Sequence, residues 1–149
     1  MCRVCIVRVR VASLEADLAA RYIDRTESMR RWVAQRSECA VGYVRMCDCE
    51  EKAGLAEFAR AFTLEAETSR ALVLDIRGND GGHVAGVVLS RLCLRTLGHD
   101  LPRRGRPVRW PAGAAPPGPC VLLCDECTSS DGDCLAWAFR RLGLGVVVG

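Results

Sequence analysis

A serine in a run of small and acidic residues is the first candidate for chemistry in this chain. Ser130 lies between Asp125 and Asp133, after a buried apolar segment and before an amphipathic one. A serine at a sharp strand-to-helix turn is an exposed nucleophile, and the next backbone amide points at the oxygen of a tetrahedral intermediate. Structurally, Ser129 or Ser130 would instead be a helix N-cap, with Asp131 and Asp133 complementing the helix dipole. The segment alone leaves both interpretations open.

A glycine-rich loop is the second candidate. The sequence Asn79-Asp80-Gly81-Gly82 follows the apolar segment 71–76 and precedes an apolar segment from 83 to 97. A turn of this kind presents backbone N–H groups at a helix N-terminus, where they hold a phosphate or a developing oxyanion. The phosphate-loop patterns G-x-G-x-x-G and G-K-[ST] are absent, which argues against a nucleotide site. A tight turn that only needs positive φ is the remaining alternative.

Ten cysteines are the compositional oddity of the chain. Three groups have spacings that bear on metal binding: Cys2-x-x-Cys5, Cys47-x-Cys49 and Cys120-x-x-x-Cys124-x-x-Cys127. The first two are weak signals, whereas the third can present three thiolates to an iron–sulfur cluster. Segment 119–124 is typical of a buried strand, however, so Cys120 and Cys124 would point to one face, away from a ligand-bearing loop. We therefore expect small core residues, no metal and no cofactor, and reduced thiols in a cytoplasmic protein.

Length and charge exclude several classes of protein. With 149 residues, half of them hydrophobic, the chain is long enough for one globular domain with its own core. No apolar run approaches the roughly 20 residues of a membrane helix, so no membrane partner is expected. The 21 basic residues are scattered along the chain, and the densest group, 103–109, has no interleaved aromatics that would stack on bases. No nucleic-acid partner is expected either.

Hydrophobic periodicity predicts the elements that must position these residues. Residues 3–11 alternate like an edge strand, and Ser13 is the expected N-cap of a helix that runs to about Ser37. The remaining predicted elements are a strand at 40–46, an amphipathic helix around 55–62, a buried strand at 71–76, a helix at 83–97, a loop at 98–118, a strand at 120–124, a helix from 131 to about 142 and a strand at 144–148. This alternation predicts βαβ units and an α/β fold.

The two candidate loops together resemble the motifs of the tail-specific (C-terminal-processing) serine peptidases, most closely those of the tricorn type. The matching segments are 41–44, 75–82, 98–105, 125–126, 130–133 and 142–149. The resemblance covers 22–149 and implies a ClpP/crotonase-like βαβ core at 21–149, preceded in 1–20 by the end of a PDZ-like domain. Because the last apolar strand stops at Gly149, we expect the peptidase domain to be truncated at its C-terminus.

The resemblance implies a serine peptidase that cleaves peptides or unfolded protein segments through an acyl-enzyme. Ser130 matches the nucleophile of the family, and the backbone N–H groups of Gly82 and Asp131 match its oxyanion hole. Asp100 matches the family acid that favours basic residues at the cleavage site. The complete protein is implied to be a homo-oligomer.

A general base is missing from this assignment. The only histidines, His83 and His99, stand where the family has a bulky residue and an aromatic, so neither is expected to be catalytic. The family takes its base from a subdomain before the PDZ-like domain and a supporting carboxylate from beyond residue 149, so this chain alone is expected to be inactive. Asp125 also replaces the usual Asn. The alternative is a non-catalytic peptide-binding or scaffold relative that lacks the base.

Overall fold

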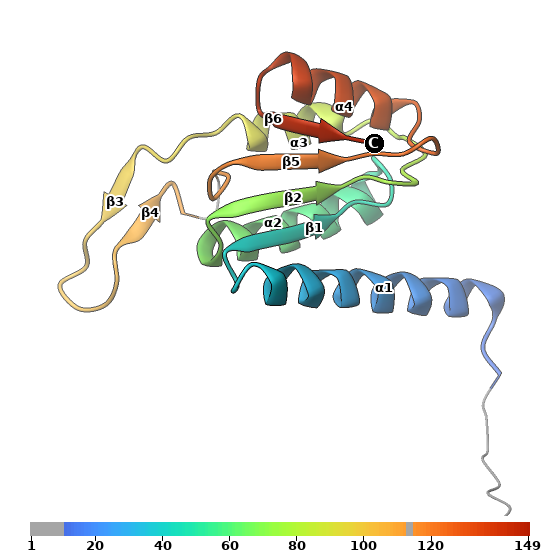
Figure 1. Ribbon diagram of the computed structural model, residues 1–149, viewed down its shortest axis with the longest axis horizontal. Helices are drawn as coiled ribbons and strands as arrows, with labels where there is room; N and C mark the ends of the chain where they lie inside the picture. Colours follow the sequence, from blue (N-terminus) through green and yellow to red (C-terminus); the bar gives the residue numbers. More distant parts are fainter. Residues whose placement is uncertain (1–10, 113–114) are drawn as a thin grey trace, which may run out of the picture.

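A parallel sheet forms the centre of the computed structural model, which describes residues 11–112 and 115–149 (Figure 1). Its strands within the described residues are β1 (Val41–Arg45), β2 (Ala71–Asp75), β5 (Cys120–Leu123) and β6 (Gly145–Val148), in the order β1-β2-β5-β6. The register brings Val44, Leu74, Leu122 and Val147 into one row across the sheet. The first three of these are fully buried, so this row forms the middle of the core.

Helices connect and cover the strands. They are α1 (Leu14–Arg36), a π-helical turn η1 (Glu51–Leu55), α2 (Ala56–Thr68), α3 (Ala85–Leu92) and α4 (Asp131–Arg141). The helix α1 begins where the Ser13 hydroxyl accepts the Ala16 N–H at 3.2 Å, as predicted, and it lies along the edge strand β1 (Figure 1). Helices α2, α3 and α4 supply apolar side chains to the core: Phe58, Phe62, Ala66, Ala85, Val88, Leu92, Leu135 and Phe139. The predicted α/β fold is confirmed.

Two of the predicted elements are wrong in extent. The helix expected at 83–97 ends at Leu92, because the chain then leaves the core and exposes Leu97, whose N–H donates to the Trp110 carbonyl at 2.9 Å. The segment expected as a loop at 98–118 contains an antiparallel hairpin of β3 (Gly98–Asp100) and β4 (Val108–Trp110). Strands of three mostly exposed residues have no alternation that a sequence pattern can detect.

The N-terminal predictions concern residues that the structure covers only in part. The strand expected at 3–11 lies outside the described residues except for Val11, which is in no strand. The domain boundary expected between residues 20 and 21 falls inside the continuous helix α1, and the PDZ-like assignment of 1–20 stays a prediction. No helix of the described residues combines the length and the apolar character that crossing a membrane requires.

The topology determines where a site can form. Because all strands of the main sheet are parallel, the loops that follow β1, β2 and β5 gather at one end of it, where their carboxyl ends lie (Figure 1). The hairpin β3–β4 projects from the opposite end (Figure 1). The glycine loop and the serine turn are therefore neighbours, while the hairpin is remote from both.

Candidate active site

The glycine loop and the serine turn are in direct contact. Gly81 has φ +102° and is buried beneath Ser130: a Cβ placed on Gly81 would lie 2.6 Å from Ser130 Cβ and 3.0 Å from its Oγ. The same Cβ would lie 3.1 Å from the Asp131 nitrogen. Only glycine allows the two loops to approach this closely. The segments that sequence analysis singled out thus form one site, with Ser130 exposed at its surface.

Ser130 has an unusual backbone conformation. It stands at the N-cap position of α4 with φ 55° and ψ −119°, and its hydroxyl makes no capping hydrogen bond. Positive φ at a residue other than glycine costs about 1–3 kcal/mol, and residues strained in this way cluster at functional sites. The interpretation of Ser130 as an ordinary helix N-cap is therefore wrong, because a capping serine has extended backbone and binds an amide of the first turn. Its hydroxyl remains available for chemistry.

Next to the contact between Gly81 and Ser130, two backbone N–H groups have no acceptor among the described residues. Within the described residues, neither the Gly82 nor the Asp131 N–H donates to another group. Asp131 is the first residue of α4, where amides have no partner inside the helix. The positive end of the α4 dipole lies at the same place. The arrangement can stabilise a negative oxygen held next to Ser130.

The loop after β1 is a third component of the site, which the sequence did not reveal. Cys49 forms a parallel bridge with Gly82: its N–H donates to the Gly81 carbonyl at 2.6 Å, and its carbonyl accepts the His83 N–H at 2.8 Å. The bridge holds the glycine loop in place and turns the Gly82 amide away from Cys49. The sequence marked Cys49 only for its spacing from Cys47, because no local pattern reports a bridge between distant segments.

The Cys49 thiol is not a competing nucleophile. Burial, followed by the negative charge of Asp131, raises the pKa of this thiol to about 12. A thiol with such a pKa is protonated at neutral pH, and the thiolate is the reactive form. Cys49 therefore contributes its backbone and its packing, whereas the Ser130 hydroxyl is exposed above the glycine loop.

Asp125 ties the serine turn to the start of the glycine loop. Its Oδ1 accepts the Gly78 N–H at 2.8 Å and the Cys127 N–H at 3.1 Å. These bonds, that from Gly78 first, hold the pKa of the Asp125 carboxyl below its ordinary value. The acceptor role needs only an oxygen at this position, which an Asn also offers. The departure from the family motif at Asp125 is therefore compatible with an intact loop.

A buried ionic network anchors the other end of the glycine loop. Asp75, the last residue of β2, is fully buried and accepts the Tyr43 hydroxyl at 2.6 Å. Arg77 donates to both of its oxygens, at 2.9 and 2.7 Å, and Arg45 adds a bond of 3.3 Å. Burial alone would raise the pKa of Asp75, but the bonds from Arg77 and Tyr43 outweigh it and lower this pKa. The network keeps Asp75 ionised.

The substitution Asp75→Asn is expected to lower the free energy of unfolding by about 3–5 kcal/mol at pH 7, because it leaves two arginines without their buried partner. A group with a lowered native pKa stabilises above its unfolded pKa, and this contribution is lost as pH falls through the native pKa. The difference in the free energy of unfolding between wild type and variant should therefore become smaller at acid pH. Urea denaturation at several pH values measures it. Asp80→Asn, at an exposed position, is the control, and equal losses in both variants would contradict the network's role.

Asp100, which the motifs assigned to substrate binding, and the two histidines, which were not expected to be catalytic, all lie away from Ser130. Asp100 lies in β3, on the hairpin at the opposite end of the sheet, and His99 precedes it there (Figure 1). His83 is exposed, with its ring nitrogens 3.6 Å from Glu50 and 3.8 Å from Glu51. Among the described residues neither histidine hydrogen-bonds to Ser130. Among the described residues, the geometry thus places an exposed serine hydroxyl next to free backbone amides, without a histidine bonded to it.

The described cysteines do not gather into a metal site. Across 11–112 and 115–149, no three His, Cys, Asp or Glu side chains are grouped so as to hold an ion. Cys120 is buried in β5, whereas Cys127 is exposed in the turn that follows. The eight cysteines in this part of the chain are all free thiols.

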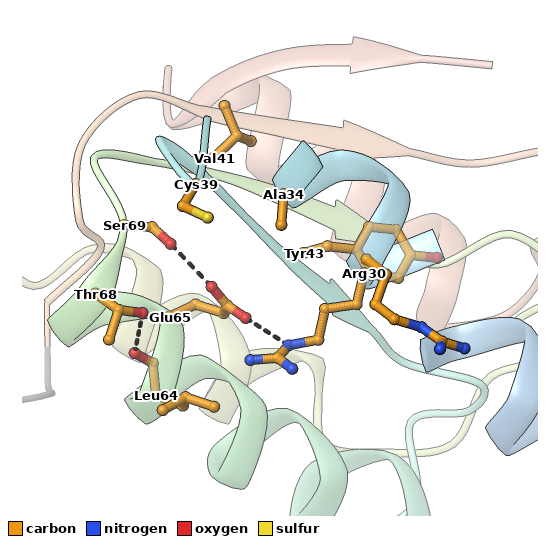
Figure 2. A pocket seen from close by; sticks show the side chains of 10 residues that line it. Arg30, Ala34, Cys39, Val41, Tyr43, Leu64, Glu65, Thr68 and Ser69 are labelled. Atoms are coloured by element: carbon orange, nitrogen blue, oxygen red, sulfur yellow. Dashed lines mark hydrogen bonds and ion pairs between the residues drawn. The ribbon is translucent and has the colours of Figure 1, made fainter. Parts of the chain in front are cut away.

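A cavity of about 310 Å³ lies between α1, α2 and β1, near the amino ends of β1 and β2 (Figure 2). Its central charged group is Glu65, which accepts the Arg30 Nε–H at 2.9 Å and the Ser69 hydroxyl at 2.8 Å (Figure 2). The Glu65 carboxylate is thus hydrogen-bonded through both of its oxygens. These groups lie at the end of the sheet opposite to Ser130. The cavity is a separate feature of the fold.

Comparisons with known proteins agree with this geometry. The model of peptidase family S41 matches residues 40–149. A tricorn protease homologue of Streptomyces coelicolor is 42% identical over 143 residues, 95% of this chain, and the tricorn protease of Thermoplasma acidophilum is 35% identical over 136 residues, 91% of this chain. The crystal structure of the tricorn protease superposes with a TM-score of 0.81 at 35% identity over 85% of this chain.

The match is to a part of these proteins. This chain spans 12% of the length of each of the three. The resemblance to the tail-specific peptidases, which the sequence motifs indicated, is confirmed, and so is the expectation that the chain is a fragment of such a protein with the fold of this family. The chain belongs to peptidase family S41.

Proposed function

We propose that the complete protein is a serine peptidase in which this chain supplies the nucleophile and the oxyanion hole. The observation that carries the proposal is the meeting of Ser130, held at positive φ with an uncapped hydroxyl, with the free amides of Gly82 and Asp131. Membership in peptidase family S41 supports the same reaction.

The mechanism is acyl transfer. Ser130 Oγ attacks the carbonyl carbon of a peptide bond, and the electron pair of the C=O bond moves to its oxygen, which the Gly82 and Asp131 amides stabilise. A general base takes the hydroxyl proton and passes it to the leaving amine as the C–N bond breaks. Water then hydrolyses the acyl ester and frees Ser130. Because neither histidine reaches Ser130, the base comes from another segment of the complete protein or from a second copy.

The proposed substrates are peptides and unfolded protein segments, since Ser130 is exposed on a surface that an extended chain can reach. The complete protein is proposed to be a homo-oligomer, as the resemblance implies. The cytoplasm is the proposed compartment, because the eight cysteines of the described residues are free thiols, which is typical of a reducing environment.

An acyl-enzyme experiment tests the reaction. The complete protein is mixed with an activated peptide ester, quenched in acid and examined by intact mass. We expect a mass increase equal to the acyl group, together with a burst of the leaving alcohol. Steady turnover without a burst, and without a mass increase at any time, would contradict a covalent mechanism.

A peptide-binding relative that does not cleave is the second candidate. The observation that favours it is the absence of a histidine bonded to Ser130 among the described residues. A Ser-His pair encoded upstream and a glutamate encoded downstream in the same gene would favour the enzyme. Peptide affinity without acylation would favour the binding protein.

Asp100 is proposed to favour basic residues at the cleavage site. Since β3 lies at the end of the sheet opposite to the serine turn of the same chain, we propose that Asp100 acts on a substrate bound to another copy. Asp100→Asn is expected to lower the ratio of kcat/KM for Arg over Leu substrates by roughly tenfold. Fluorogenic peptides differing only at the cleaved residue measure this ratio. Asp24→Asn, exposed on α1, is the control, and an unchanged ratio in Asp100→Asn would reject the role.

A further inference from the structure

Asn79 is a buried polar residue at the point where the three loops of the site meet. It has no exposed surface. Its side-chain nitrogen donates to the Met46 carbonyl at 3.2 Å, and its side-chain oxygen accepts the Gly81 N–H at 2.9 Å. Its backbone carbonyl accepts the Ser129 N–H at 2.9 Å. One residue thus bonds to the loop after β1, to the glycine loop and to the serine turn.

These bonds fix the groups on both sides of the proposed reaction. Gly81 immediately precedes the Gly82 amide, and Ser129 immediately precedes Ser130. A displacement of either neighbour changes the distance between the nucleophile and the oxyanion donor. The Cys49 thiol also lies 3.6 Å from the Asn79 side-chain oxygen, so the side chain is enclosed and held in one position.

A second link joins the same two loops farther from the nucleophile. Asp131 Oδ2 accepts the Ala85 N–H at 2.8 Å, which ties the first residue of α4 to the first residue of α3. The amides of Gly82 and Asp131 therefore lie between two cross-links, one through Asn79 and one through the Asp131 carboxylate. Of the two, only the Asn79 link also reaches the loop after β1.

We propose that Asn79 is a positioning residue whose side chain holds Gly81, and with it the Gly82 oxyanion donor, against the loop after β1, while its backbone carbonyl holds Ser129 next to the nucleophile. This inference rests on the proposed function. Asn79 touches no reacting atom, so its removal should weaken the transition state more than the binding of substrate. Small displacements of catalytic groups reduce the chemical step strongly.

The test compares kcat, KM and inhibition by a peptide aldehyde in the complete protein. The aldehyde forms a hemiacetal with the serine hydroxyl. The former aldehyde oxygen of this hemiacetal occupies the oxyanion hole. For Asn79→Ala we expect kcat to fall about 100-fold with KM within about threefold of wild type, as for loss of one oxyanion donor. Aldehyde affinity should fall in parallel with kcat. Asn79→Asp keeps an acceptor for the Gly81 N–H, but it loses the donor to the Met46 carbonyl and, when ionised, adds a negative charge near the oxyanion donors, so it should not restore kcat.

Ser69→Ala is the matched control, because it also removes a buried hydrogen bond, the one to Glu65, at the opposite end of the sheet (Figure 2). It should leave kcat and aldehyde affinity unchanged. Wild-type kcat in a folded Asn79→Ala would overturn the inference, as would failure of both Asn79 variants to fold, which would assign this residue a structural role. If the wild type forms no acyl-enzyme, the proposed function fails. If the wild type forms one and Asn79→Ala has the same kcat as the wild type, only the inference on Asn79 fails.

Discussion

Replacing Ser130 with alanine is expected to reduce peptide hydrolysis by the complete protein about 10⁴- to 10⁶-fold, because the variant has no nucleophile. The fold should be preserved. The Ser130 hydroxyl makes no capping bond, so its loss should change the free energy of unfolding by less than about 1 kcal/mol. Fluorogenic peptide turnover and urea denaturation measure the two effects on the same preparation.

The neighbouring serine offers a matched control. Ser129 is also exposed, and its backbone N–H, which donates to the Asn79 carbonyl, is retained in Ser129→Ala. This variant should keep wild-type kcat. The opposite pattern, with Ser129→Ala inactive and Ser130→Ala active, would show that the nucleophile has been assigned to the wrong residue.

Replacing Gly82 with alanine is expected to lower kcat about 100- to 1,000-fold, the cost of losing one oxyanion donor. Gly82 has φ +144°, and a Cβ placed there would overlap the Cys49 carbonyl group. The added methyl group must push the two segments apart, which breaks the bridge between Gly82 and Cys49 and moves the Gly82 amide. Peptide turnover and aldehyde affinity, both measured in the complete protein, report the displacement.

Gly78→Ala separates this effect from backbone strain. Gly78 also has positive φ, +70°, but a Cβ there would meet nothing within 4 Å. Its substitution should cost roughly 1 kcal/mol in the free energy of unfolding and leave kcat within a few fold of wild type. If Gly78→Ala and Gly82→Ala lowered kcat equally, the loss would come from general strain in the loop and not from the oxyanion donor.

The sequence predicted the framework of the fold because hydrophobic periodicity is a local signal. The row Val44, Leu74 and Leu122 is buried as the apolar runs predicted, and the stripe of Phe58 and Phe62 packs on the sheet. The parallel arrangement followed from the alternation of strands and helices. The hairpin was missed because its strands are short and mostly exposed.

The site could be predicted only as two separate loops. Whether Ser130 is a helix cap or an exposed nucleophile depends on a backbone angle, and no pattern of residue types reports φ at a single position. The bridge from Cys49 and the bonds of Asn79 join segments that are distant in the sequence. These contacts arise from tertiary packing, so only the folded chain reveals that the loops form one site.

The identity of the reactive residue is the most direct test of the proposed reaction. The complete protein is labelled with a fluorophosphonate probe, digested, and the modified residue is mapped by mass spectrometry. We predict modification of Ser130, with the label lost in Ser130→Ala and retained in Ser129→Ala, because only an activated serine next to an oxyanion hole reacts rapidly with such probes. Labelling of a different residue, or no labelling of the folded complete protein, would contradict the assignment of Ser130 as the nucleophile.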